Sequence, residues 1–167
     1  MGIPCYFSSI IRKYNKIMFK KDESKFETNN FYLDSNSIIY DAIRKCDILT
    51  PNFEKQLMYE VVFQLEQHIY DVNPINKTII AFDGIAPMAK IQQQRERRFK
   101  SDLERKLRSK LYKKEEAWDT CNITPGTKFM KDLMCHIEQY FSKFENVEIY
   151  SSNVPGEGEH KLFEYIR

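Results

Sequence analysis

Two aspartates stand where a folded chain could gather them around a metal ion. Asp34 follows the apolar run of residues 30–33, and Asp83 follows residues 78–82. Both runs are short and apolar or β-branched, as in strands buried on both faces of a parallel sheet. Since the carboxyl ends of parallel strands meet at one edge, where α/β domains bind ligands, we expect the two carboxylates to lie close together.

Two further carboxylates follow a third predicted strand, residues 147–150, in a Gly-Glu-Gly-Glu loop at the start of a new helix. Carboxylates sharing one crevice would repel each other, by about 4 kcal/mol for unit charges about 4 Å apart at an effective dielectric of roughly 20. Mg²⁺ or Mn²⁺ would remove that cost, and two such ions can activate water and stabilise the leaving oxygen of a phosphodiester. The candidate catalytic and metal-binding residues are Asp34, Asp83, Glu157 and Glu159.

The same four residues also have a plainer interpretation. Asp34 and Asp83 suit ordinary turns, and Glu157 and Glu159 favour the N-terminus of a helix electrostatically. One aspartate after a strand fits that interpretation better than it fits a metal site. Two such aspartates together with the glycine-rich acidic loop leave both interpretations open.

A strongly basic segment follows the second aspartate. Residues 90–114 contain eleven Lys and Arg against three acidic residues. An apolar residue recurs at every fourth position, which predicts an amphipathic helix whose apolar stripe can dock on the domain. The residues of that stripe are Phe99, Leu103, Leu107 and Leu111.

A second face of this predicted helix carries charged groups and an amide at i, i+4, i+7 and i+8. These are Lys90, Gln94, Arg97 and Arg98. Their charged groups and amide could bind a terminal phosphate. Because the helix begins just after Asp83, its first turns would lie near the proposed metal site. The competing interpretation is a solvated charged face, which is the usual role of Lys/Arg runs. Tyr40, on another predicted helix, could stack on a base or pack in the core.

The remaining pattern predicts the fold class. Residues 52–70 show helical periodicity, and another helix follows the start signal at residues 124–127. Strands alternating with helices predict an α/β domain with a mainly parallel central sheet. Because we find no internal repeat or low-complexity linker, we draw no domain boundary within residues 1–167.

Composition narrows the class of protein. The 42% hydrophobic content of the 167 residues excludes wholesale disorder, and a net charge of +2 says little about partners. The N-terminus lacks the apolar core of a signal peptide, and no stretch is long enough to cross a membrane. The four cysteines form no framework, so we expect reduced thiols in an intracellular protein and no structural zinc. We expect a location in the cytoplasm rather than in the nucleus.

Six segments together resemble the Xrn family of 5′→3′ exoribonucleases in order and spacing. The Gln/Arg-rich segment and the Thr-Pro-Gly-Thr segment separate this family from its flap-endonuclease relatives. The six segments are residues 1–4, 32–39, 81–87, 89–99, 122–127 and 154–161.

This resemblance implies a three-layer PIN-like or 5′-nuclease-like fold with the site at the sheet's carboxyl edge. It implies metal-dependent hydrolysis of RNA from a 5′-monophosphate end, releasing nucleoside 5′-monophosphates with two Mg²⁺ or Mn²⁺ ions. The four carboxylates would belong to the metal cluster. The 5′-phosphate and RNA would be held by Lys90, Gln94, Arg97, Arg98 and Tyr40.

The sequence departs from the family pattern in places. Tyr40, Ser37 and Cys5 stand where the family usually has His, Gly and Lys. The family completes its metal cluster with aspartates further along than Arg167, so we expect residues 1–167 to be the N-terminal part of the nuclease domain. Two other functions stay open, a non-catalytic RNA-binding module and half of a split nuclease completed by a second polypeptide.

Overall fold

The structure, a computed structural model, describes residues 5–18, 27–112 and 118–167. Its centre is a parallel sheet of three strands in the order β1-β2-β3. The strands are β1 (Asn30–Asp34), β2 (Lys77–Ala81) and β3 (Val147–Tyr150). All three predicted strands are therefore confirmed, within one residue at each end. The first of the six family segments and the basic residues Lys113 and Lys114 lie outside the described residues.

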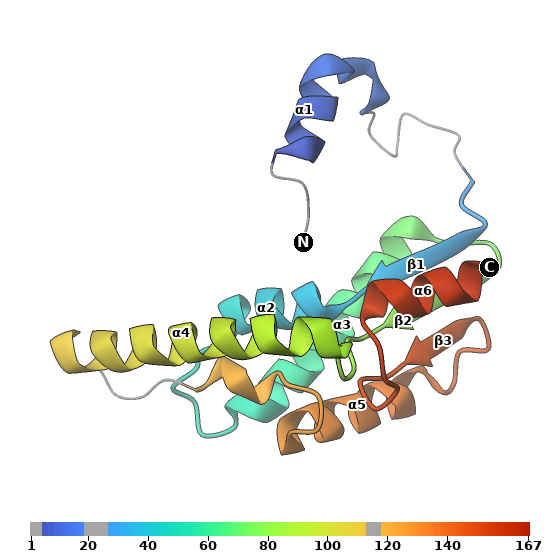
Figure 1. The fold of residues 1–167 in the computed structure, drawn as a ribbon. Coiled ribbons are helices and arrows are strands. Elements are labelled where there is room, and N and C mark those ends of the chain that lie inside the picture. Colours follow the sequence, from blue (N-terminus) through green and yellow to red (C-terminus); the bar gives the residue numbers. More distant parts are fainter. Residues whose placement is uncertain (1–4, 19–26, 113–117) are drawn as a thin grey trace.

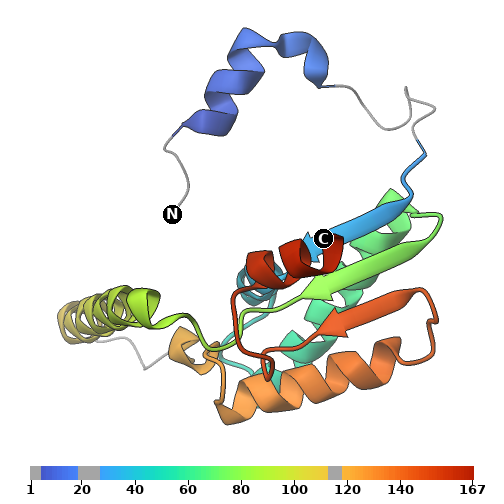
Figure 2. The same ribbon diagram turned by 45° about the vertical axis from the view of Figure 1, so that its right-hand side comes forward.

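Helices cover both faces of this sheet (Figures 1 and 2). The long helices α3 (Phe53–Val72) and α5 (Lys128–Phe141) pack on one face and contact each other. Helix α6 (Gly158–Ile166) contacts β1 and β2 on the other face. Helix α2 (Asn36–Lys45) packs against α3. The prediction of a three-layer α/β fold is confirmed.

The core lies between the sheet and the α3–α5 layer. Leu57, Val61 and Leu65 of α3 recur at helical spacing and are fully buried. They belong to one apolar cluster with Ile80 of β2 and Ile137 of α5. Burial of this layer fixes the position of β2, and with it the direction in which the chain leaves the sheet toward Asp83.

The Thr-Pro-Gly-Thr segment starts α5, as predicted. Thr127 is the N-cap residue, and its hydroxyl accepts a hydrogen bond from the Met130 backbone N–H. The same hydroxyl lies 2.5 Å from the Asn122 carbonyl oxygen. The cap therefore begins the helix and also holds the preceding turn, which includes the short 3-10 helix η3 (Thr120–Asn122).

The basic helix α4 (Met88–Tyr112) forms as predicted, but the three residues of its apolar stripe whose side chains are described do not dock on the domain. Phe99, Leu103 and Leu107 are 72%, 48% and 51% exposed. Figure 1 gives the reason, because the helix leaves the sheet edge and extends away from it. Only its first turns lie near the sheet, so periodicity correctly indicated a helix and wrongly indicated its packing.

The N-terminal helix α1 (Tyr6–Lys13) and the 3-10 helix η1 (Asn15–Ile17) lie apart from the sheet in both views and bury no side chain (Figures 1 and 2). Within the described part of the chain, no helix combines the length and apolar character needed to cross a membrane.

A buried lysine joins the carboxyl ends of β2 and β3. Lys161, in the second turn of α6, is 3% exposed and donates hydrogen bonds to the Phe82 carbonyl oxygen at 2.7 Å and the Ser151 carbonyl oxygen at 2.9 Å. Burial lowers the pKa of Lys161, and the negative charge of Asp83 acts against that shift. This ammonium group therefore fixes the backbone immediately before Asp83.

We predict that Lys161→Met destabilises the protein by about 2–4 kcal/mol, because it leaves two buried acceptors without a donor at about 1–3 kcal/mol each. Urea unfolding measures the change. Lys131→Met on the exposed surface of α5 is the matched control and should stay within about 0.5 kcal/mol of the unmodified protein. Equal stability of the two variants would contradict a structural role for Lys161.

Candidate active site

Asp34 lies at the end of β1, against the start of α6. A Cβ atom on Gly158 would stand 2.6 Å from the Asp34 Oδ1 atom and 3.4 Å from the Ala81 carbonyl oxygen. Any larger residue here would have to push the Asp34 carboxylate aside, so glycine lets the helix begin against that carboxylate. The glycine between Glu157 and Glu159 therefore brings these two acidic residues to the sheet edge.

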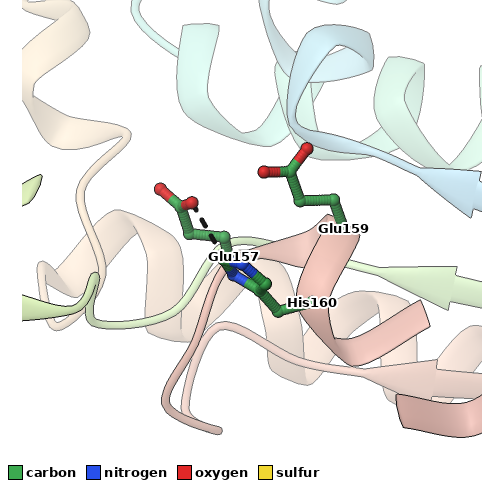
Figure 3. A group of neighbouring side chains, drawn as sticks. All are labelled: Glu157, Glu159 and His160. Carbon is green, nitrogen blue, oxygen red and sulfur yellow. Dashed lines mark ion pairs between the residues drawn. The ribbon is translucent and has the colours of Figure 1, made fainter. Parts of the chain in front are cut away.

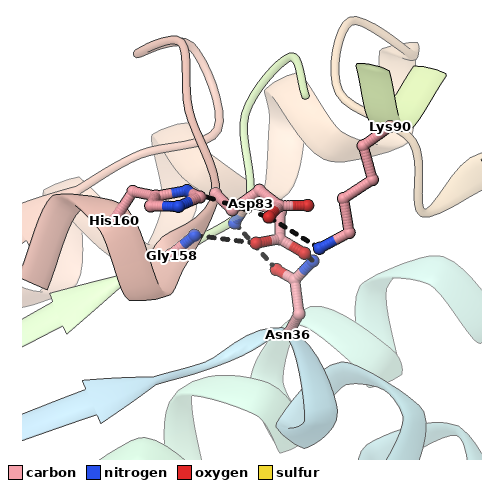
Figure 4. A network of polar contacts seen from close by, with 6 residues as sticks. Asn36, Asp83, Lys90, Gly158 and His160 are labelled. Carbon is pink, nitrogen blue, oxygen red and sulfur yellow. Dashed lines mark hydrogen bonds and ion pairs between the residues drawn. The ribbon is translucent and has the colours of Figure 1, made fainter. Parts of the chain in front are cut away.

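Three hydrogen bonds fix the position of Asp83 (Figure 4). Its Oδ2 atom accepts a hydrogen bond from the Asn36 side chain at 2.7 Å, and its backbone N–H donates to Asn36 Oδ1 at 3.1 Å. Its Oδ1 atom accepts from the Gly158 backbone N–H at 2.8 Å. The loop after Asp83 is fixed as well, because Gly84 and Gly156 are joined by a backbone hydrogen bond of 2.8 Å. The carboxylate therefore has a set position.

Gly158, which stands between Glu157 and Glu159 in the sequence, lies against both Asp34 and Asp83, so the four predicted carboxylates are neighbours at one edge of the sheet. Asp34 is exposed at the end of β1, but the partial burial of its carboxylate still raises its pKa, and the negative charge of Asp83 raises it further. The charges of Glu159 and Glu157 act in the same direction, whereas a hydrogen bond from the Asn36 backbone lowers the pKa. The charged form of Asp34 is thus disfavoured in the folded protein, as expected where anions gather without a counter-ion.

The start of α6 offers a group of possible metal ligands (Figure 3). One ligand atom from each of Glu157, Glu159 and His160 lies within 4.8 Å of the others. Carboxylate oxygens are the ligands that Mg²⁺ and Mn²⁺ prefer, and imidazole suits transition metals. Among the described residues, no such group includes Asp34 or Asp83, which lie beside this donor set rather than within it. The donor set itself has the chemistry that suits a divalent cation.

Lys90, at the start of α4, is only partly exposed and makes an ion pair across the site. Its Nζ atom lies 2.6 Å from Glu157 Oε2, and the His160 Nδ1 atom lies 3.8 Å from the same oxygen. The structure therefore places Lys90, a predicted phosphate-binding residue, against the carboxylates at the sheet edge. We call these carboxylates the acidic cluster; they are Asp34, Asp83, Glu157 and Glu159.

A cavity of about 520 Å³ opens beside Asp83. Gln94, Arg97 and Arg98 line it from α4, and Tyr40, which is 43% exposed, lines it from α2. The cavity is closed further by the segment that precedes α5, including Thr124 and Pro125. The structure thus brings four of the five predicted phosphate- and RNA-binding residues to one cavity. Asp83 belongs to both the cavity and the acidic cluster.

Sequence reasoning missed several residues of this site. Asn36 pairs with an aspartate 47 positions away, and a single sequence gives no signal for such a pairing. A lysine at position 161 gives no sign in the sequence that it is buried. His160 joins the two glutamates only once α6 has formed. Thr124 and Pro125 were recognised as a helix start, which did not reveal that they also form a cavity wall.

Comparisons with known proteins fit this arrangement. The family model for the XRN 5'-3' exonuclease N-terminus matches residues 1–167. The 5'-3' exoribonuclease 2 of Cryptococcus neoformans is 30% identical over 219 residues, and the 5'-3' exoribonuclease 2 homolog of Caenorhabditis elegans is 33% identical over 215 residues. The 5'-3' exoribonuclease 1 of Saccharomyces cerevisiae is 34% identical over 187 residues.

These alignments cover 100% of this chain but 19%, 22% and 12% of the three relatives, so the chain spans about a fifth of their length or less. The PIN-like nuclease fold of this family agrees with the three-layer α/β architecture, and its nucleases depend on metal ions. The resemblance seen in the six sequence segments is confirmed. The chain belongs to the XRN 5'-3' exonuclease family and corresponds to its N-terminal region.

Proposed function

We propose that the protein is a metal-dependent 5′→3′ exoribonuclease that degrades 5′-monophosphorylated RNA to nucleoside 5′-monophosphates. The observation that supports this most strongly is the shared position of Asp83. Its carboxylate borders the acidic cluster and also the cavity lined by Arg97 and Arg98. A phosphate held by the two guanidinium groups would therefore lie beside the cation-binding edge.

We further propose that the protein acts in RNA decay in the cytoplasm, a reducing compartment that suits cysteines without a disulfide framework.

The proposed cation site consists of the acidic groups at the sheet edge, which would hold two Mg²⁺ or Mn²⁺ ions. Bound ions would activate the attacking water and stabilise charge on the leaving oxygen. Asn36 and the Gly158 N–H fix the Asp83 carboxylate before any ion binds, so little rearrangement of that ligand is needed. Because the chain spans only part of its relatives, we propose that further sequence or a second polypeptide completes the ligand set.

The proposed phosphate site explains why a single phosphate would be preferred. Arg97 and Arg98 offer planar, permanently charged forks, and Gln94 adds an amide donor. Thr124 and Pro125 line the same cavity, and we propose that this wall leaves no room for a cap or a triphosphate. Tyr40 lies at the same cavity and is exposed enough to stack on the first base.

The alternative function is a non-catalytic RNA-binding module, or half of a split nuclease that becomes active with a second chain. One observation favours it. Glu157 is held by Lys90, so one proposed metal ligand is already occupied by a protein cation. In this case the cavity would still bind a 5′-phosphate, whereas cleavage would be absent or would need the partner.

The first test compares RNA carrying a 5′-monophosphate with RNA carrying a 5′-triphosphate, each in Mg²⁺, by following release of nucleotides. We expect the monophosphate substrate to be degraded much faster. Asp83→Asn should slow cleavage by about a hundredfold or more. Arg97→Gln should lower the preference for monophosphate by about tenfold to a hundredfold, as expected for a lost charged hydrogen bond of about 1.5–3 kcal/mol.

Arg44→Gln is the matched control, because this exposed arginine pairs with Asp41 on α2. It should leave both rate and preference unchanged. Cleavage that ignores the 5′ end and both site variants would refute the proposal. Binding that depends on Arg97 without cleavage would favour the RNA-binding module, and cleavage only with a second polypeptide would favour the split nuclease.

A separate test examines the acidic cluster through stability. Without divalent cations, Asp34→Asn should raise the melting temperature by about 2–4 °C, because it removes one repelling charge worth about 1 kcal/mol. Added Mg²⁺ should stabilise the unmodified protein and have less effect on this variant. Asp132→Asn on the exposed surface of α5 should change neither value. A cation site is contradicted if Mg²⁺ stabilises Asp34→Asn as strongly as the unmodified protein.

A further inference from the structure

The ion pair between Lys90 and Glu157 joins two groups that the sequence pattern assigned to different ligands. Glu157 is a proposed metal ligand, and Lys90 was predicted to bind the 5′-phosphate. Their charged atoms, Lys90 Nζ and Glu157 Oε2, are 2.6 Å apart, so each group has one of its binding positions taken by the other while the pair is intact.

The ammonium group of Lys90 occupies the place of a cation within the acidic cluster. Its hydrogen bond to Glu157 raises the pKa of Lys90, and the negative charges of Glu159 and Asp83 add to the effect. The Asp34 carboxylate of the same cluster also feels the charge of Glu157. A divalent ion among these carboxylates would compete with the ammonium for Glu157 and would repel it.

The two partners differ in their freedom to move. The Glu157 side chain is 8% exposed and lies at the start of α6. The Lys90 side chain is 36% exposed, and its ammonium group is carried on a flexible chain of four carbons. A cation that binds Glu157 would therefore displace Lys90 rather than the carboxylate.

The geometry of α4 determines where the released side chain can go. Lys90 lies one helical turn before Gln94 and about two turns before Arg97, on the same face of the helix. Gln94 and Arg97 line the cavity beside Asp83. The lysine therefore stands at the boundary between the acidic cluster and the cavity, within reach of a phosphate bound there.

We propose that the Lys90–Glu157 ion pair couples the two ligands of the site, so that a divalent cation, by taking Glu157, releases Lys90 to bind the 5′-phosphate. This inference rests on the proposed function and adds to it a way in which the bound cation regulates binding of the 5′-phosphate. Without the cation, Lys90 is withheld and the preference for a 5′-phosphate is weak. By linkage, the phosphate must strengthen binding of the cation by the same factor.

The test measures binding of a single-stranded oligoribonucleotide by fluorescence anisotropy, with a 5′-phosphate or a 5′-hydroxyl end, in Ca²⁺ or in EDTA. Ca²⁺ replaces Mg²⁺ so that cleavage does not interfere. For the unmodified protein, we expect the preference for the phosphorylated end to rise about tenfold on adding Ca²⁺, within the range typical of coupled sites. Lys90→Gln should show a similar preference in both conditions.

Arg97→Gln is the matched control, because Arg97 lines the cavity on the same helix, about two turns beyond the lysine that holds Glu157. It should lower the preference in both conditions but keep the rise caused by Ca²⁺. Calorimetry with Mn²⁺ gives a second readout. Lys90→Gln should bind Mn²⁺ more tightly than the unmodified protein, since the competing ammonium is gone, and Arg97→Gln should not.

The outcomes separate this inference from the proposed function. If Lys90→Gln retains the full effect of Ca²⁺, the cation attracts the phosphate directly and the coupling through the ion pair is wrong. If the unmodified protein prefers the 5′-phosphate equally with and without Ca²⁺, the coupling is also wrong, but the phosphate site stands. If it shows no preference in either condition, the proposed function itself fails.

Discussion

Asp34 and Asp83 repel each other, and the sheet keeps them together nonetheless. Parallel pairing sets Asp34 opposite Ala81, two residues before Asp83, so both side chains leave the sheet at the same edge. The cost of this arrangement is seen in Asp34, whose raised pKa reflects burial and the nearby negative charge. The core between the sheet and the α3–α5 layer must offset that cost. Binding sites are commonly maintained at the expense of stability in this way.

The surroundings reduce the repulsion without removing it. Asn36 and the Gly158 N–H donate hydrogen bonds to Asp83, and two lysines supply positive charge. Lys161 is buried and fixed by carbonyl oxygens, so its role is structural. Lys90 is partly exposed and is paired with one carboxylate, that of Glu157, so it can be exchanged for another cation. Two lysines near one cluster thus have different roles because their burial and partners differ.

Local patterns in the sequence were sufficient to predict the strands, the α/β class and the strand-end aspartates. They failed where the outcome depends on distant contacts. The Asn36–Asp83 pair joins residues of two different strand-to-helix turns, and no periodicity reveals it. The apolar stripe containing Phe99 predicted docking, but the direction in which α4 leaves the sheet decided its exposure. Lys90 was expected at a phosphate, although nothing in its own helix indicates a competing carboxylate 67 positions away.

All these features converge on one cleft shared by a cation and a terminal phosphate. A crystal structure of the protein with Mn²⁺ and a nucleoside 5′-monophosphate, with the metal located from its anomalous scattering, examines that cleft directly. We predict Mn²⁺ bound by carboxylate oxygens that include those of Asp34 and Asp83, with the phosphate in contact with Arg97 and Arg98. Carboxylates too far apart to share an ion, or a phosphate bound away from these arginines, would contradict the proposed site.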